Sequence, residues 1–499
     1  MKLSTQQEAV LDWAANKEGS LNLVARAGCG KTSTLIELVK AIPDEQSVTL
    51  CAFNKAIAEE VKAKLATEGL DQKAEAATMH SLGLRAWKRQ APKCAVEGSK
   101  VYKILDAMNL PYRDRELKSH IVKLVSYAKQ ALVAPARLKG DADYTARLIE
   151  LGQHFGVDED FPLEGHNLEL VRQAHLASYE ADEEVVDFDD MLTAPLLRGC
   201  AFSGADWVLL DEAQDTNAAR QELALAMLEN GSRLVAVGDP RQAIYGFTGA
   251  MSDAMGLLAS KLGSAELPLN HTFRCAKTVV AHAQQWVPDI YAYETNPEGS
   301  VSWCEYEHWL KTPFKASDVI LCRLNRPIVA LAYQFIRDGV GCRVEGRDIG
   351  QGILKLARRF KTDSLKRLRT LVELYRDEET AKFIAKYQDA KAASVGDKCD
   401  TLIELIVRLT MPNPAATLTD LEQLVSTMFG DTVGKQAVLT LSTVHKSKGR
   451  EWDRVYLLGR NQWMPLPWAK SGWELAQEQN LIYVAVTRAK SNLVEVIVP

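Results

Sequence analysis

The stretch LNLVARAGCGKTSTLIELVKAI, residues 21–42, decides the fold. Residues 21–26 are a short β-rich run, AGCGKT follows, and residues 33–42 carry apolar side chains at helical spacing. A strand, a glycine-rich turn and a helix in this order form the context in which a loop can bind phosphates. We therefore predict a phosphate-binding loop, with a chance glycine-rich turn as the alternative.

The residue types in this loop suit ATP and Mg²⁺. Glycines let backbone N–H groups turn toward the phosphates, Lys31 reaches the β- and γ-phosphates, and the Thr32 hydroxyl is a metal ligand. Ala25 stands where the usual pattern has glycine, but it adds only one methyl group. The predicted nucleotide contacts of the loop are Ala27, Gly28, Cys29, Gly30, Lys31, Thr32 and Ser33.

A second stretch, WVLLDEAQD (207–215), is an apolar run that ends in acids. In an enzyme with a phosphate loop, such a strand lies in the same sheet and its first acid faces the loop. Asp211 is therefore the second predicted Mg²⁺ ligand, acting through water, and Glu212 is the predicted base that orients and deprotonates the attacking water. A surface acidic turn is the alternative. Both stretches together predict an ATPase.

Four further stretches follow in order along the chain. They are LVAVGDPRQAIYGF (234–247), LNHTFR (269–274), LTLSTVHKSKGREWD (439–453) and LIYVAVTRAK (481–490). The whole set resembles the superfamily 1 helicases of the UvrD/Rep/PcrA type, whose phosphate loop also begins with alanine. AFNKAIAEE (52–60) and GDPRQAIYGF lean toward the branch that contains F-box DNA helicases and related phage and bacterial helicases. The resemblance implies an α/β fold with two RecA-like P-loop motor domains.

The resemblance also assigns roles within the nucleotide site. Gln6 matches the glutamine that reads adenine, and Gln7 is the alternative if the register differs by one residue. Gln242 matches the glutamine that senses the γ-phosphate. Phe273 stands where the family stacks a tyrosine on adenine, and Glu451 matches the acid that touches the ribose.

Two arginines from the second half of the chain complete this site in the family. Arg274 and Arg488 match the pair that reaches the γ-phosphate, whereas Lys31 and Glu212 lie in the first half. The resemblance therefore implies a cleft that closes on ATP and opens after hydrolysis. A surface salt bridge is the alternative role for each arginine. The predicted catalytic residues are Lys31, Asp211, Glu212, Gln242, Arg274 and Arg488.

Single-stranded DNA is bound through its phosphates and by stacking of its bases on aromatic rings. The candidate contacts lie in loops that follow predicted strands, and they are Phe53, Asn54, Lys55, Thr78, His80, Tyr245, Phe247, Thr443 and His445. Core packing is the alternative for each aromatic ring. Because the net charge is −5 and the pI is about 6.1, any DNA contacts must be concentrated in a groove.

Composition narrows the setting. The 499 residues contain no apolar run near the length of a membrane span and begin with no signal or transit pattern, so we expect no membrane partner and a cytoplasmic location, bacterial or in a phage-infected host. Nine scattered cysteines without a CxxC pair indicate neither a disulfide framework nor a zinc site.

Alternating strand and helix patterns predict two motor domains, residues 1–265 and 266–499. A helical insertion is expected at about 86–185 in the first domain and a second insertion at about 348–436 in the other. The segment 354–369 carries seven basic residues and one acid. It would suit duplex phosphates, and a solvated helical face is an equal alternative.

The leading hypothesis is an ATP-dependent single-stranded-DNA translocase and DNA helicase, moving 3′ to 5′ in DNA repair, recombination or replication. The direction follows from the resemblance alone. We expect a monomeric motor that binds single-stranded DNA and junctions of single and double strands, with any protein loading partner unidentified. The alternatives are an ATP-driven nucleic-acid switch or protein-displacing translocase with little unwinding, and a 5′-to-3′ or RNA-directed superfamily 1 motor.

Overall fold

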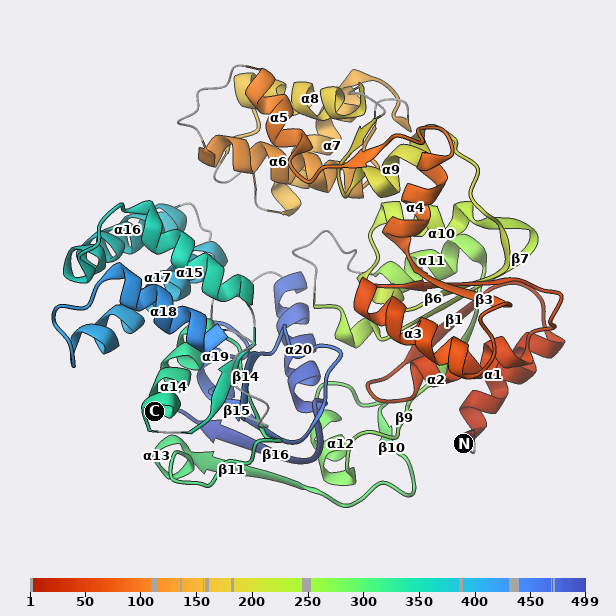
Figure 1. Cartoon of the computed structure of the whole chain (residues 1–499). Helices are drawn as coiled ribbons and strands as arrows, with labels where there is room; N and C mark the ends of the chain where they lie inside the picture. The colour runs from red at the N-terminus through yellow and green to blue at the C-terminus, as the bar shows by residue number, and fades with distance from the viewer. Residues whose placement is uncertain are drawn as a thin grey trace. The chain divides into compact units, whose positions relative to one another are not determined.

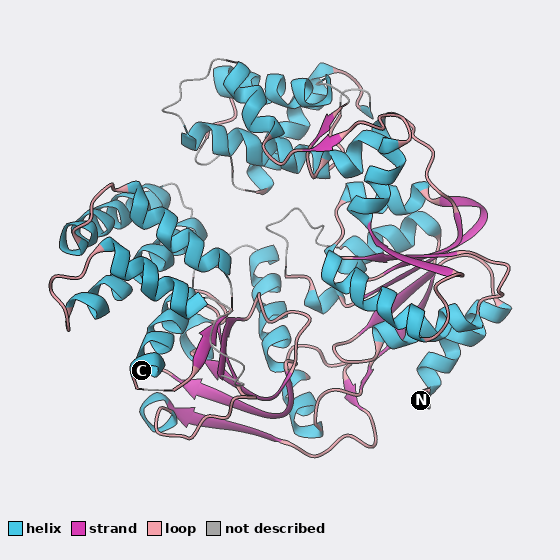
Figure 2. Cartoon of the chain, viewed as in Figure 1, coloured by secondary structure: helices cyan, strands magenta, loops and turns pink. Residues whose placement is uncertain are grey.

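The structure is a computed structural model. It describes residues 3–108, 115–134, 137–155, 157, 161–180, 184–244, 253–338, 340–345, 347–385, 389–429, 439–467, 469 and 472–499. The chain divides into two compact units, Met1–Asn270 and His271–Pro499, and each is built on its own six-stranded parallel sheet (Figures 1 and 2). The predicted α/β class with two RecA-like parallel-sheet domains is confirmed.

The sheet of the first unit has the strand order β3-β2-β6-β7-β1-β8, and every neighbouring pair is parallel. Its strands are β1 (Leu21–Ala25), β2 (Val48–Ala52), β3 (Ala74–Thr78), β6 (Ala205–Leu210), β7 (Leu228–Gly238) and β8 (Ala265–Leu269). Because all strands run in one direction, the loops at their carboxyl ends meet at one edge of the sheet. This edge carries the phosphate loop.

Helices cover both faces of this sheet, since successive side chains of a strand point to opposite faces. Leu209 of β6 packs in a hydrophobic cluster with α1, α2 and α3 on one face of the sheet. Val208 and Leu210 pack in a second cluster, with α4, α9, α10 and α11, on the other face. The helices of the core are α1 (Thr5–Asn16), α2 (Lys31–Ala41), α3 (Lys55–Thr67), α4 (Met79–Lys88), α9 (Asp190–Leu197), α10 (Ala218–Ala226) and α11 (Ala254–Leu262).

A helical segment interrupts the first unit and has a hydrophobic cluster of its own, which includes Leu105, Leu124 and Leu148. Its elements are β4 (Ala95–Val96), α5 (Lys100–Ala107), α6 (Arg115–Gln130), α7 (Asp141–His154), α8 (Gly165–Glu180) and β5 (Val185–Val186). An ion cluster ties it to the core: Lys129 Nζ of α6 lies 2.7 Å from Asp187 Oδ2 and 2.6 Å from Asp190 Oδ1.

The sheet of the second unit has the strand order β11-β16-β15-β12-β14-β13 and is also parallel throughout. Its strands are β11 (Ser300–Glu305), β12 (Val319–Cys322), β13 (Cys342–Val344), β14 (Leu439–Thr443), β15 (Trp452–Leu458) and β16 (Ala489–Ile497). A short parallel pair, β9 (His271–Thr272) and β10 (Tyr291–Ala292), lies outside this sheet.

The helical insertion of the second unit packs differently from that of the first. Leu368, Leu402 and Leu421 of the insertion share one hydrophobic cluster with Ile320 and Leu441 of the sheet, so this insertion has no separate core in the described structure. The helices are α12 (Lys277–Ala283), α13 (Tyr306–Trp309), α14 (Asn325–Arg337), α15 (Arg347–Arg359), α16 (Leu365–Ala385), α17 (Asp389–Thr410), α18 (Leu418–Phe429), α19 (Arg460–Trp463) and α20 (Gly472–Val486).

The basic segment 354–369 spans the end of α15 and the start of α16, and its charged side chains are exposed. Part of the charge is neutralised, because Arg358 pairs with Glu422 at 2.8 Å and Arg369 pairs with Glu373 at 2.7 Å. None of the described helices is both long and apolar enough to cross a membrane.

Candidate functional site

The phosphate loop connects β1 to α2. Gly28 and Gly30 have φ angles of 72° and 77°, a left-handed conformation that glycine adopts without steric cost. Helix α2 begins at Lys31, and no side chain caps its start. The first N–H groups of the helix are therefore not bonded to a capping side chain, and they lie at the positive end of the helix dipole. This arrangement binds phosphate.

Lys31 is held beside the acids that follow β6. Its Nζ lies 2.7 Å from Glu212 Oε1. Burial by itself would lower the pKa of Lys31, but the carboxylates of Glu212 and Asp211 outweigh it and raise the pKa. Burial, reinforced by the neighbouring Glu212, raises the pKa of Asp211 to about 6. The cluster thus holds one fixed positive charge against two acids.

The backbone aims Glu212 into this cluster. Glu212 has a φ angle of 49°, which is uncommon for a residue with a side chain and costs conformational energy. The 3₁₀ turn η2 (Ala213–Asp215) follows, and Gln214 Nε2 donates to Glu212 Oε2 at 2.5 Å. A strained residue held by such a contact is typical of a functional site.

Sequence reasoning missed a buried network around Asp239. Asp239 Oδ1 pairs with Arg26 NH1 at 3.0 Å, and its backbone N–H donates to Gln214 Oε1 at 3.0 Å. The predicted γ-phosphate sensor Gln242, in the 3₁₀ turn η3 (Pro240–Gln242), donates to Asp239 Oδ2 at 2.8 Å. The sequence offered one signal of this network: a charged residue, Arg26, stands at a position where the loop pattern specifies no residue type. The network joins the phosphate loop to the motif after β7.

The side chains present suit Mg²⁺. Neither the Thr32 hydroxyl nor Asp211 Oδ2 has a hydrogen-bond partner in the described structure, whereas Asp211 Oδ1 accepts from the Glu212 N–H at 2.9 Å. A hydroxyl and a carboxylate are hard oxygen ligands, and Mg²⁺ takes its remaining ligands from phosphates and water. Within the described residues, His, Cys, Asp and Glu form no metal-binding group of three or more.

The two candidate adenine contacts differ in their surroundings. Gln7 is buried, shares a capping box with Ser4 at the start of α1, and donates to Thr34 Oγ1 at 3.0 Å. Gln6 is only partly buried and donates to Asn270 Oδ1 at 2.6 Å. Gln6 Oε1 also accepts from the Asn270 N–H at 2.9 Å, so both amides are engaged in the fold, and Gln6 is the more accessible of the two candidates.

In the second unit, Arg274 forms an ion pair with Glu451, and its NH1 donates to the Thr487 carbonyl at 3.4 Å. The predicted sugar contact and one predicted arginine thus lie together. The ring of Phe273 lies 4.7 Å from that of Tyr293. A tyrosine is therefore available beside the position where the family stacks one.

Arg488 differs from Arg274. Its side chain is fully buried, its Nε donates to the Val484 carbonyl at 2.9 Å, and its NH1 donates to the Arg450 carbonyl at 2.9 Å. These bonds hold the end of α20 against the segment that contains Glu451. In this structure the guanidinium therefore supports its own unit.

The candidate DNA contacts of the first unit follow β2 and β3. Asn54 Oδ1 accepts from the Ile57 N–H at 3.0 Å and caps α3, while Thr78 Oγ1 accepts from the Ser81 N–H at 3.2 Å and caps α4. Both polar side chains therefore have a helix-capping role. Phe53, Lys55 and His80 lie beside these caps. Tyr245 and Phe247 lie outside the described residues.

The candidate contacts of the second unit follow β14. Thr443 is buried at the end of the strand. Burial, with the positive charges of Arg323, Lys448 and Lys446, lowers the pKa of His445 to about 3. His445 is therefore neutral at physiological pH and can act as a hydrogen-bonding group but not as a cation.

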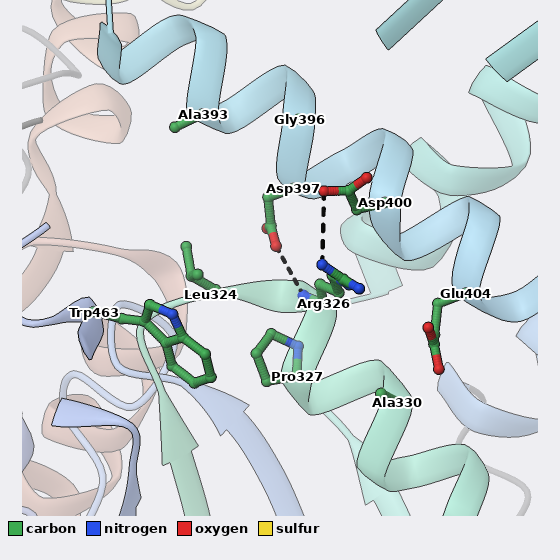
Figure 3. A pocket seen from close by; sticks show the side chains of 10 residues that line it. All are labelled: Leu324, Arg326, Pro327, Ala330, Ala393, Gly396, Asp397, Asp400, Glu404 and Trp463. Carbon is green, nitrogen blue, oxygen red and sulfur yellow. Dashed lines mark hydrogen bonds and ion pairs between the residues drawn. The ribbon is translucent and has the colours of Figure 1, made fainter. Parts of the chain in front are cut away.

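A hollow of about 480 Å³ lies in the second unit, beside the start of α14 and the middle of α17 (Figure 3). Asp397 accepts from the backbone N–H groups of Asn325 and Arg326, at 3.0 and 2.9 Å, and so caps α14. Asp400 pairs with Arg376 at 2.7 Å. Because its lining is acidic and includes none of the predicted nucleotide contacts, this hollow does not suit phosphate.

Comparisons with known proteins cover most of the chain. Residues 3–262 match the UvrD/REP helicase N-terminal domain, and residues 346–497 match the UvrD-like helicase C-terminal domain.

Three curated relatives show how far the similarity extends. F-box DNA helicase protein 1 of Schizosaccharomyces pombe is 25% identical over 99% of this chain and 57% of its own length. A probable DNA helicase II homolog of Mycoplasma genitalium is 23% identical over 93% of this chain and 80% of its own length. The ATP-dependent DNA helicase PcrA of Staphylococcus aureus is 26% identical over 59% of this chain and 40% of its own length. The chain thus spans less than two thirds of the first and third relatives.

Proposed function

Because the chain belongs to the UvrD/Rep helicase family, we propose that it is an ATP-dependent single-stranded-DNA translocase that unwinds duplex DNA from 3′ to 5′. The observation that carries the proposal is the contact of Lys31 with Glu212 at the edge of the sheet where Asp211 follows β6. A lysine on a phosphate loop beside paired acids suits hydrolysis of a nucleoside triphosphate.

The residues of the first unit divide the hydrolytic work. The N–H groups at the start of α2 and Lys31 bind the β- and γ-phosphates, while Thr32 and Asp211 hold Mg²⁺. Bound Mg²⁺ neutralises phosphate charge. Glu212, oriented by Gln214, accepts a proton from the attacking water. Gln242 is positioned by Asp239 to sense the γ-phosphate.

The proposal assigns Arg274 and Arg488 of the second unit to the γ-phosphate. Arginines at this position stabilise the charge that develops on the transferred phosphoryl group. Arg274 is supported in this role by its partly buried position beside Glu451, the proposed ribose contact. Arg488 would have to exchange at least one backbone carbonyl for a phosphate oxygen. Phe273 and Gln6 would contact adenine.

The proposed DNA contacts are the ring of Phe53, the charge of Lys55, and the polar groups Thr443 and His445. Base stacking on an aromatic ring is tolerant of sequence, and so suits a motor that steps along any strand. We propose that the motor acts as a monomer on single strands and on junctions, in DNA repair, recombination or replication. No specific observation favours the switch, RNA or 5′-to-3′ alternatives.

Strand displacement tests the proposal. Duplexes that carry a 3′ tail, a 5′ tail or no tail are incubated with the protein, Mg²⁺ and ATP, and the released strand is measured. We expect unwinding only from the 3′ tail. Unwinding only from the 5′ tail would reverse the polarity. DNA-stimulated hydrolysis without unwinding of any duplex would favour a switch, and stimulation by RNA alone would favour an RNA-directed motor.

A further inference from the structure

Arg220, in the first turn of α10, lies at the same edge of the first sheet as the candidate DNA contacts, although no motif assigned it a role. Its guanidinium carbon lies 5.1 Å from the centroid of the Phe53 ring. Its charge also acts on His80, whose pKa is lowered to about 4 by burial and then by Arg220. Arg220 thus adjoins two residues proposed to contact DNA.

The hydrogen bonds of Arg220 leave most of its donors available. NH1 donates to the Asp215 carbonyl at 3.2 Å, and the described structure shows no ion pair between Arg220 and a carboxylate. Asp215 and Asp189 act on its charge only at longer range. A guanidinium carries five N–H donors, and a partly buried one without a paired carboxylate in the described structure is well suited to a phosphate.

The Asp215 carbonyl connects Arg220 to the hydrolytic cluster. Asp215 is the last residue of η2, and its N–H donates to the Glu212 carbonyl at 2.9 Å. Gln214, in the same turn, donates to Glu212 Oε2 at 2.5 Å. One short turn therefore touches Glu212 at its start and Arg220 at its end. A displacement of the turn would change the orientation of the proposed general base.

We propose that Arg220 is a positioning residue that couples single-stranded DNA to ATP hydrolysis. A DNA phosphate beside the base stacked on Phe53 binds the N–H groups of Arg220. The same guanidinium holds the Asp215 carbonyl, and so DNA occupancy fixes η2 and the carboxylate of Glu212. This inference rests on the proposed function and deepens it, because it names the route by which DNA stimulates hydrolysis. Such coupling is reciprocal: if bound DNA changes the affinity of the site for ATP, bound ATP changes the affinity for DNA by the same factor.

The test compares Arg220→Gln and Arg220→Lys with the parent protein. ATP hydrolysis is measured against the concentration of a single-stranded oligonucleotide, which gives the stimulation ratio and the half-saturating concentration. For Arg220→Gln we expect the stimulation ratio to fall about tenfold or more and the half-saturating concentration to rise. Arg220→Lys keeps the positive charge but not the planar guanidinium. Its half-saturating concentration should therefore lie closer to the parent value than its stimulation ratio does. If Arg220 had a purely structural role, its substitution would lower ATP hydrolysis with and without DNA alike, and would leave the stimulation ratio and the half-saturating concentration unchanged.

Matched controls separate the outcomes. Arg85→Gln removes an exposed arginine from the last turn of α4, where it pairs with Glu75, and should match the parent. If Arg220→Gln lowers the thermal unfolding midpoint, Arg220→Lys decides the result. The double variant with Phe53→Ala and Arg220→Gln should lose less DNA stimulation, expressed as a free energy, than the sum of the losses in the two single variants. Parent-like values in both Arg220 variants would overturn the inference alone. A parent protein that DNA does not stimulate would overturn the proposed function as well.

Discussion

Lys31 and Glu212 form an ion pair in which Nζ and Oε1 lie 2.7 Å apart, with side chains only 13% and 21% exposed. The pair joins the phosphate loop to the acids after β6, across 181 positions of sequence. A bound γ-phosphate would compete with Glu212 for the same ammonium group. ATP binding would therefore draw Lys31 away from Glu212 and leave the carboxylate to accept a proton from water.

Lys31→Ala should reduce DNA-stimulated ATP hydrolysis at least about 100-fold, because it removes the fixed positive charge at the phosphates. The rate of phosphate release at saturating DNA measures the loss. Lys40→Ala, which removes an exposed lysine near the end of the same helix, is the matched control and should retain the parent rate. A near-normal rate in Lys31→Ala would show that this loop is not the hydrolytic site.

Glu212→Gln should lower the hydrolysis rate by about 10²-fold or more while ATP still binds. The amide cannot accept the proton of the attacking water, but it no longer holds Lys31 in an ion pair. We therefore expect a dissociation constant for ATP that is equal to or lower than that of the parent, measured by titration with a fluorescent ATP analogue. A large loss of binding with normal turnover would reassign Glu212 to nucleotide binding.

The Mg²⁺ requirement should depend on pH through Asp211, whose pKa is raised to about 6. Above this pH the carboxylate is ionised and can hold Mg²⁺, and below it a proton competes. The Mg²⁺ concentration for half-maximal hydrolysis should rise by up to about tenfold for each pH unit below 6. Asp211→Asn is the control, because the pH dependence that it retains comes from ATP and from other groups of the site, such as Glu212. Equal slopes in the parent and in Asp211→Asn would contradict the assignment.

Arg274→Ala should lower the hydrolysis rate by about 10³-fold, the loss typical of an arginine that stabilises phosphoryl-transfer charge. ATP affinity should change much less, since that charge develops only in the transition state. The rate constant at saturating ATP and the Michaelis constant separate these effects. Arg369→Ala, which removes an exposed arginine paired with Glu373, should behave like the parent. A higher Michaelis constant at an unchanged rate constant would make Arg274 a binding residue only.

Sequence patterns predicted the family, the two parallel-sheet domains and the strand–loop–helix context of Lys31. They succeed because these features depend on short local patterns, and the comparisons confirm the family. Contacts between distant segments were not predictable. The ion pair of Arg26 with Asp239 and the packing of Arg220 on Phe53 each join residues more than 160 positions apart. Only the sheet order, which brings β2, β6, β7 and β1 together, makes these contacts possible.

The two insertions show a second limit of sequence reasoning. Both were predicted as interruptions of a motor domain, the first of them from helical periodicity, yet one has its own hydrophobic cluster and the other shares the cluster of its sheet. Periodicity shows that a helix has an apolar face but not which surface that face will cover. The polar caps show the same limit: Asn54 and Thr78 match DNA-contact motifs, and their side chains also start α3 and α4.

Lys129→Met should destabilise the first unit by about 3–5 kcal/mol, because it leaves Asp187 and Asp190 buried without their shared cation. Lys100, which lies 2.7 Å from Asp190 Oδ2, can compensate only part of the loss. The free energy of unfolding, measured by urea denaturation at neutral pH, tests the prediction. Lys103→Met, which removes an exposed lysine paired with Glu97, should change this free energy by less than about 1 kcal/mol. Equal stability of the two variants would mean that the buried cluster does not hold the helical segment to the core.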